Sequence, residues 1–94
     1  MKKKFLAICG AGIGSSVLLK MLVDNACQKF SIDAEIENGD MSAARGDVDV
    51  IFTSLAFAED LMDRFPDVPV ISVKNYVDNA EMEGYFRELG LVDS

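Results

Sequence analysis

The sequence is organised around one short stretch that lies between an apolar run and a helical pattern. The run Phe5-Leu6-Ala7-Ile8 has the composition of a buried strand, and apolar residues at helical spacing begin at Val17. Between them lie Cys9 and the glycine-rich residues 10–16. Glycines let the backbone turn so that successive N–H groups converge, and the N-terminus of the next helix adds partial positive charge. The stretch therefore predicts an anion site, for a bound phosphate or for the cysteine itself as a thiolate.

The rest of the chain alternates strand and helix patterns. Strands are expected at residues 4–9, 32–37, 48–53 and 70–73, and helices at about 15–30, 57–65 and 79–89, the last ended by Gly90. Residues 41–46 fit a loop or a single helical turn. The alternation predicts one α/β domain over residues 1–94, with a four-stranded parallel sheet in the order 2-1-3-4 flanked by helices.

Ligands of such sheets bind at the carboxyl ends of the strands, near the switch point in strand order. Three segments are expected to converge on that edge: Cys9 with its loop, Thr53-Ser54 after the third strand, and residues 74–78 after the fourth. Each helix is expected to bury one face. The core-facing residues of the first are Leu19, Leu22, Val23, Ala26 and Phe30, and those of the second are Leu61, Met62 and Phe65.

Charge and composition exclude several classes of function. The net charge is −7 and the only basic cluster is the three lysines near the N-terminus, so we expect no nucleic-acid partner. The chain has no histidine, which excludes a histidine base, a histidine ligand and a phosphohistidine on this chain. We expect no metal and no cofactor. No apolar run approaches the roughly 20 residues of a membrane span, and the basic-then-apolar start is interpreted as a strand rather than a signal peptide.

The two cysteines are expected to have different roles. Cys9 and Cys27 are separated mostly by one predicted helix, which places them roughly 20 Å apart, whereas a disulfide needs Cα atoms about 6 Å apart. No bridge is expected, in keeping with a reducing cytoplasm. Cys27 is interpreted as a small buried apolar residue. Cys9 is expected to titrate below about pH 8, because loop amides and a helix N-terminus lower a thiol pKa.

The glycine loop does not match a nucleotide site. The dinucleotide pattern G-x-G-x-x-G requires glycine at Ser15, and the Walker pattern requires a lysine that is missing before Ser16. The loop instead resembles the phosphate loop of low-molecular-weight tyrosine phosphatases, in which an arginine follows the cysteine after five residues. Ser15 occupies that position here, and Asp78 is the one candidate acid near the edge. Phosphatase activity therefore stays a minor alternative.

A second resemblance extends over essentially the whole chain. Ile8 to Ser16, Val50 to Ser54 with Ala58 and Glu59, and Val73-Lys74-Asn75 are similar to the enzyme IIB components of sugar phosphotransferase systems, in the ascorbate/galactitol branch and closest to the ascorbate type. The resemblance implies a fold like that of the phosphatases and a cytoplasmic protein-phosphocysteine–sugar phosphotransferase. In it, Cys9 accepts a phosphoryl group from a phosphohistidine of an A component and passes it to a sugar on a membrane C component.

The same resemblance assigns the remaining site residues. The phosphate cradle comprises Gly10, Ala11, Gly12, Ile13, Gly14, Ser15 and Ser16, acting through backbone amides and the two hydroxyls. One of the serines is also expected to cap the helix. Partners are expected to dock around residues 53–59 and 74–78. The alternative is a non-catalytic, B-like regulatory module whose loop binds an anion or a partner without turnover.

Overall fold

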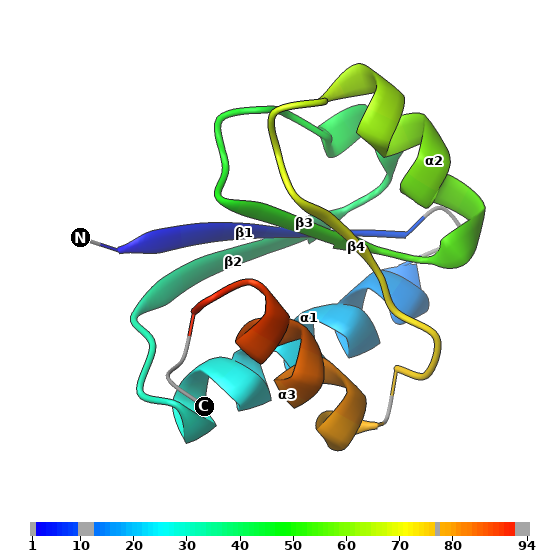
Figure 1. Ribbon diagram of the computed structural model, residues 1–94. Helices are drawn as coiled ribbons and strands as arrows, with labels where there is room; N and C mark the ends of the chain where they lie inside the picture. The colour runs from blue at the N-terminus through cyan, green and yellow to red at the C-terminus, as the bar shows by residue number, and fades with distance from the viewer. Residues whose placement is uncertain (1, 10–12, 77, 92–94) are drawn as a thin grey trace.

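The computed structural model describes residues 2–9, 13–76 and 78–91 (Figure 1). Its strands are β1 (Lys3–Ile8), β2 (Ala34–Gly39), β3 (Val50–Thr53) and β4 (Val70–Ser72). They pair in parallel in the order β2-β1-β3-β4. The predicted fold class and strand order are therefore confirmed. All four carboxyl ends meet at the edge of the sheet on the right of Figure 1, where α1 and α2 also begin.

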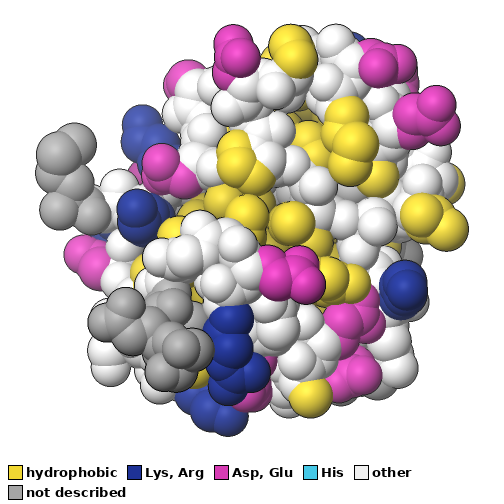
Figure 2. Space-filling view, viewed as in Figure 1, with side chains coloured by type: hydrophobic (Ala, Val, Ile, Leu, Met, Phe, Trp, Pro, Cys, Tyr) yellow, Lys and Arg dark blue, Asp and Glu magenta, His cyan; other side chains and the backbone are white. Residues whose placement is uncertain are grey.

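Helices cover both faces of the sheet. The helices α1 (Ile13–Lys29) and α3 (Asn79–Glu88) lie on one face, and α2 (Leu55–Arg64) lies on the other with the short 3₁₀ turn η1 (Met41–Ala43) (Figure 1). Within the described part of the chain, no helix is both long and apolar enough to cross a membrane. The face shown in Figure 2 presents hydrophobic side chains along β4 and between α2 and α3, with acidic side chains both at its margins and beside this hydrophobic strip.

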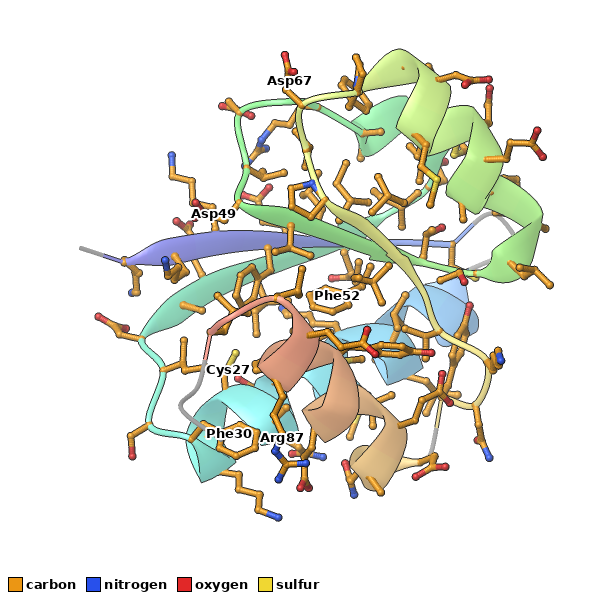
Figure 3. All side chains as sticks on the ribbon, viewed as in Figure 1. Cys27, Phe30, Asp49, Phe52, Asp67 and Arg87 are labelled. Atoms are coloured by element: carbon orange, nitrogen blue, oxygen red, sulfur yellow. The ribbon has the colours of Figure 1, made fainter. Side chains whose placement is uncertain are left out.

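The alternation of side chains along the central strands divides the core into two clusters. Phe5 on β1 and Phe52 on β3 point toward α1 and α3, where they meet Phe86, and the centroids of the three rings are pairwise 5.7–6.0 Å apart. Figure 3 shows Phe52 between the sheet and these helices. Leu6 and Ile51 point the other way, toward α2. Both central strands are thus buried on two faces, as expected for the middle of a parallel sheet.

Several predicted boundaries differ from the observed ones. The strand expected at 32–37 is β2, which begins two residues later, because α1 ends in a tight turn in which the Ile32 N–H donates to the Cys27 carbonyl (2.8 Å). Ser31 adopts a φ of 56° in that turn. Residues 41–46 start with the 3₁₀ turn, capped by the Asp40 side chain, which accepts from the Ser42 N–H.

The predicted buried faces are mostly confirmed, with one error. Leu19, Leu22, Val23 and Ala26 are buried on α1, and Phe30 packs against them. On α2, Leu61 is buried and Phe65 follows at the same face, but Met62 is 48% exposed. Ala58 takes the place expected for Met62, because Ala58, Leu61 and Phe65 share a face at the 3/4 spacing and Met62 lies to one side of it.

Candidate functional site

Cys9 lies immediately after β1, at the carboxyl edge of the sheet. Its backbone N–H donates to the carbonyl oxygen of Gly39 at the end of β2 (3.0 Å), so the residue is fixed between the two neighbouring strands. It is 4% exposed. The helix α1 begins four residues further on, which brings its N-terminus and its partial positive charge to the same edge (Figure 1).

A phenol lies against the Cys9 thiol. The Tyr76 hydroxyl lies 3.5 Å from Cys9 Sγ, although the two residues are far apart in sequence. Tyr76 follows β4, and the parallel topology returns that segment to the same edge as the end of β1. The Tyr76 hydroxyl also forms a hydrogen bond with the side chain of Ser54, the residue after β3. The ends of three strands are therefore joined through one hydroxyl.

The neighbouring Thr53 has a structural role. Its side chain is completely buried, and Oγ1 donates to the Ile8 carbonyl oxygen (2.7 Å). The carbonyl of Thr53 in turn accepts from the Val73 N–H (2.8 Å). These bonds hold the ends of β1 and β3 and the segment after β4 in a fixed arrangement, and Thr53 itself does not reach the site.

Hydrogen bonds to α3 fix the position of residues 74–76, the segment that contains Tyr76. The Glu81 carboxylate accepts from the backbone N–H groups of Lys74 (2.8 Å) and Asn75 (3.1 Å), and also from the Tyr85 hydroxyl. Burial opposes ionisation of this carboxyl group, but these hydrogen bonds outweigh it and lower the pKa of Glu81. Asp78 is the N-cap of α3, and its carboxylate accepts a hydrogen bond from the Glu81 N–H (3.2 Å). Its carboxylate therefore has a structural role.

The two tyrosines near this edge both have raised pKa values. Burial, and then the hydrogen bond to Cys9, raise the pKa of Tyr76 to about 12. Burial, and then the Glu81 carboxylate, raise the pKa of Tyr85 to about 12 as well. Both phenols therefore keep their protons at neutral pH and act as hydrogen-bond donors.

A pocket of about 560 Å³ adjoins this cluster. Its lining comes from two segments, the start of α2 and the residues after β4: Ser54, Leu55, Ala56, Val73, Lys74, Asn75 and Tyr76. Tyr76 lines the pocket and also contacts the Cys9 sulfur, and Lys74 is the cationic residue of the lining. A pocket of this kind can accept a partner's side chain next to the thiol.

Comparison with known proteins agrees with this arrangement. A family model described as PTS system, lactose/cellobiose-specific IIB subunit, matches residues 4–88. The chain belongs to this family. The enzyme IIB resemblance predicted from the glycine loop is therefore confirmed at the level of the family, whose name specifies neither the ascorbate nor the galactitol branch.

Relatives of this IIB domain include components of mannitol systems. It is 26% identical over 81 residues to the mannitol-specific EIICB component of Geobacillus stearothermophilus, covering 86% of this chain and 17% of that protein. It is 25% identical over 87 residues to the mannitol-specific cryptic EIICB component of Escherichia coli K12, covering 93% of this chain and 19% of that protein. The chain therefore spans less than a fifth of the length of these curated relatives.

The fold is shared with a solved IIB structure. The lactose-specific IIB component domain of the phosphotransferase system from Streptococcus pneumoniae superposes with a TM-score of 0.69 at 16% identity, covering 94% of this chain and 97% of that domain. At this identity the likeness concerns the fold alone.

The predicted cradle residues divide into two groups. Gly10, Ala11 and Gly12 lie outside the described residues, so their predicted role stays a prediction. Ile13, Gly14, Ser15 and Ser16 form the first turn of α1. The helix of the IIB domain begins at Ile13, two residues before Ser15, and the roles expected for the two serine side chains stay predictions. Their position still places backbone N–H groups of the first turn at the edge that bears Cys9.

Sequence reasoning missed Tyr76 and the role of Ser54. Both belong to segments that were expected to reach the edge. Ser54 was named there without an assigned role, and Tyr76 was not singled out. The available signal was topological. Tyr76 is the single phenol in the segment after β4, at the edge where the nucleophile was expected. Asp78 had been considered as a candidate acid, and the structure assigns it to the cap of α3.

Proposed function

We propose that this IIB domain is a phosphoryl relay in which Cys9 is the transient carrier. The observation that supports this most directly is the position of the thiol: it lies at the carboxyl edge of the sheet, near the N-terminus of α1 and 3.5 Å from the Tyr76 hydroxyl. Membership of the IIB family supports the same role. The donor is a phosphohistidine of an A component, and the acceptor is a sugar held by a membrane C component, which places the domain on the cytoplasmic side.

The two transfers balance around one sulfur atom. In the first, the Cys9 thiol gives up its proton to water, the thiolate forms an S–P bond, and the breaking N–P bond returns its electron pair to the donor imidazole. In the second, a sugar hydroxyl oxygen forms an O–P bond and gives up its proton to the C component or to water. The S–P electron pair returns to Cys9 as thiolate. The domain ends the cycle unchanged and needs no cofactor.

The positions of the arginines favour a relay over a phosphatase. Arg64 and Arg87 lie in the last turns of α2 and α3, remote from the ends where the strands finish. Arg45 is paired with Glu37 (2.7 Å) and Asp47 (2.8 Å). These are the three arginines of the chain. A bidentate guanidinium grip on the transferring phosphoryl group is thus missing from the proposed site, which slows attack by water and keeps phosphocysteine available for the sugar.

Exposed apolar residues surround the proposed docking edge. Val17, Leu18 and Met21 on α1 are 38%, 47% and 55% exposed, and Leu55 at the start of α2 is 73% exposed. Leu18 and Met21 also line a hollow that they share with Tyr76. We propose that A and C components contact this rim together with residues 53–59 and 74–78, in a small and transient interface.

The sugar is assigned by resemblance of the loop. The residues from Ile8 to Ser16 are most similar to the ascorbate type, and we propose this branch, with galactitol as the nearest variant. The test is transfer from the phosphorylated domain to radiolabelled ascorbate or galactitol in vesicles that contain the matching C component. Transfer to mannitol or lactose instead would contradict the proposed branch.

The relay itself is tested by mass spectrometry. The domain is incubated with phosphoenolpyruvate, the general phosphotransferase proteins and a matching A component. We expect the mass gain of one phosphoryl group, labile in acid, that is lost in Cys9→Ser and retained in Cys27→Ala. Serine keeps the shape of cysteine but is a far weaker nucleophile near neutral pH. If the wild-type domain gains no phosphate under these conditions but binds the A component, the regulatory alternative is correct.

A further inference from the structure

We propose that Tyr76 is the hydrogen-bond donor that stabilises the Cys9 thiolate, both as attacking nucleophile and as leaving group. This inference rests on the proposed relay for its biological meaning, but its physical basis is the contact between the Tyr76 hydroxyl and Cys9 Sγ (3.5 Å). Sulfur is larger than oxygen, and this separation is suitable for a hydrogen bond to it. No pattern in the sequence assigns a role to this phenol.

The direction of the hydrogen bond follows from the charge state. A thiolate has no proton to donate, so when Cys9 is ionised the Tyr76 O–H must be the donor. The Ser54 side chain helps to orient it. Ser54 is the N-cap residue of α2, yet its hydroxyl forms no capping bond and instead bonds the Tyr76 hydroxyl. That bond acts to lower the pKa of Tyr76, as expected when Ser54 donates to the phenol oxygen, which leaves the phenol proton for Cys9.

The Tyr76 proton is retained at neutral pH. Burial raises the pKa of Tyr76 to about 12, with a further contribution from its hydrogen bond and charge interaction with Cys9. Coupling between two titrating groups is reciprocal. If the Cys9 thiolate favours the protonated phenol, then the protonated phenol favours the thiolate. The same contact therefore shifts the Cys9 equilibrium toward the reactive form.

The donor is held in place before any charge develops. Glu81 on α3 binds the backbone N–H groups of Lys74 and Asn75, directly before Tyr76. Charged and titratable groups of the elements packed here include Lys74, which lines the adjoining pocket, Glu81 and Tyr85 on α3, and the α3 N-cap Asp78. A donor fixed in this way costs little reorganisation when charge develops on the sulfur. Glu81 acts through the segment and is a positioning residue.

Both transfers benefit from this arrangement. Before the first, the hydrogen bond increases the fraction of Cys9 present as thiolate. During the second, negative charge returns to sulfur as the S–P bond breaks, and a thiol with a lower pKa leaves faster.

The test is the pH dependence of alkylation in Tyr76→Phe. Wild-type and variant proteins are treated with iodoacetamide across a pH series, and the rate is followed on the tryptic peptide of residues 5–20, which contains Cys9 and not Cys27. We expect the midpoint for Cys9 to rise by about one pH unit in the variant, because a hydrogen bond to a charged group is lost. Ser54→Ala is expected to raise the midpoint in the same direction by less.

Tyr85→Phe is the matched control. It removes the other tyrosine hydroxyl of the chain, which also has a raised pKa and whose hydrogen bond is to the Glu81 carboxylate. We expect it to leave the Cys9 midpoint within about 0.3 units of wild type, since its effect is indirect. Thermal unfolding of each variant verifies that the fold is intact. Because the midpoint is measured rather than the absolute rate, a change in access to the buried thiol does not imitate the effect.

An unchanged or lower midpoint in folded Tyr76→Phe would overturn the inference, since a lower one would mean that Cys9 is the donor. The outcome is independent of the proposed relay, because alkylation requires no A or C component. If the wild-type domain accepts phosphate and the midpoint does not move, the relay stands and the role of Tyr76 is wrong. If the midpoint rises but no phosphate is accepted, the electrostatic role stands and the relay is wrong.

Discussion

The two cysteines of this chain are buried to the same degree, yet the charged and hydrogen-bonding groups around them differ. Cys9 is 4% exposed and lies at the end of a strand beside a phenol donor and a helix N-terminus. Cys27 is 3% exposed and lies in α1 within the larger core cluster (Figure 3). Burial, and then the negative charge of Asp24, raise the pKa of Cys27 to about 11.

The comparison shows that burial alone does not decide whether a thiol is reactive. Removal from water disfavours a thiolate in either place. At Cys9 that effect meets an opposing donor and the positive end of a helix dipole. At Cys27 it is reinforced by a carboxylate, so the residue behaves as a small apolar side chain. The prediction that Cys27 is a core residue and forms no disulfide is confirmed.

The largest expected difference between the two thiols is in alkylation at pH 7.5. With a pKa near 11, Cys27 is ionised to only a few parts in ten thousand, and it is packed in the core. We expect the peptide of residues 5–20 to be modified at least about 100-fold faster than the peptide of residues 21–29 in the folded protein. Urea-unfolded protein is the control, in which the two rates should converge. Equal rates in the native state would contradict the comparison.

The sequence was sufficient to predict where Cys9 lies, because the relevant signals are local and periodic. The apolar runs at Phe5–Ile8 and Val50–Thr53, with helical patterns between, determine a parallel sheet, and topology then requires the strand ends to share an edge. Helix starts were predicted less well. The apolar pattern of α1 begins at Val17, but the helical backbone extends back to Ile13.

The contacts that give the site its chemistry could not be predicted in the same way. The bond between Cys9 and Tyr76 depends on how far the segment after β4 reaches, which is set by the Glu81 carboxylate binding two backbone N–H groups. Ser54 is likewise a residue type typical of helix N-caps. Only the folded structure shows that its hydroxyl forms no capping bond and instead bonds Tyr76. Such choices between competing hydrogen-bond partners leave no periodic signal in a sequence.

The second expected effect is on how the free energy of unfolding depends on pH, through Cys27. The pKa of Cys27 is raised in the folded protein, so between about pH 9 and 11 the folded state holds a proton that the unfolded state has lost. Cys27 therefore stabilises the fold below pH 9 relative to pH 11, and this stability is lost as the pH rises. We expect the free energy of unfolding of the wild type to fall by up to about 2–3 kcal/mol more than that of Cys27→Ala over this range.

Urea titrations of both proteins at each pH measure this difference. Tyr76 and Tyr85 also have raised pKa values, but they are present in both proteins, so their contribution cancels in the comparison. Parallel curves for wild type and Cys27→Ala would mean that Cys27 ionises as readily as a thiol in water.

The smallest expected effect concerns the end of the helix that contains Cys27. The carbonyl oxygen of Cys27 accepts the Ile32 N–H, with Ser31 in the left-handed region at φ 56°. The same pattern closes α3, where the Leu91 N–H donates to Phe86 and the left-handed residue is Gly90 at φ 74°. Serine incurs a steric cost in this conformation that glycine avoids.

We therefore expect Ser31→Gly to raise the free energy of unfolding by about 0.5–1 kcal/mol, the relief of strain exceeding the greater chain entropy of glycine. Urea unfolding at pH 7 measures the change. The alkylation midpoint of Cys9 should stay at its wild-type value, because the end of α1 that holds Cys27 is the end remote from the site. A variant that gained stability and also shifted the Cys9 midpoint would show that the two thiol environments are coupled through α1. Independence would mean that the helix can be stabilised at one end without changing the chemistry at the other.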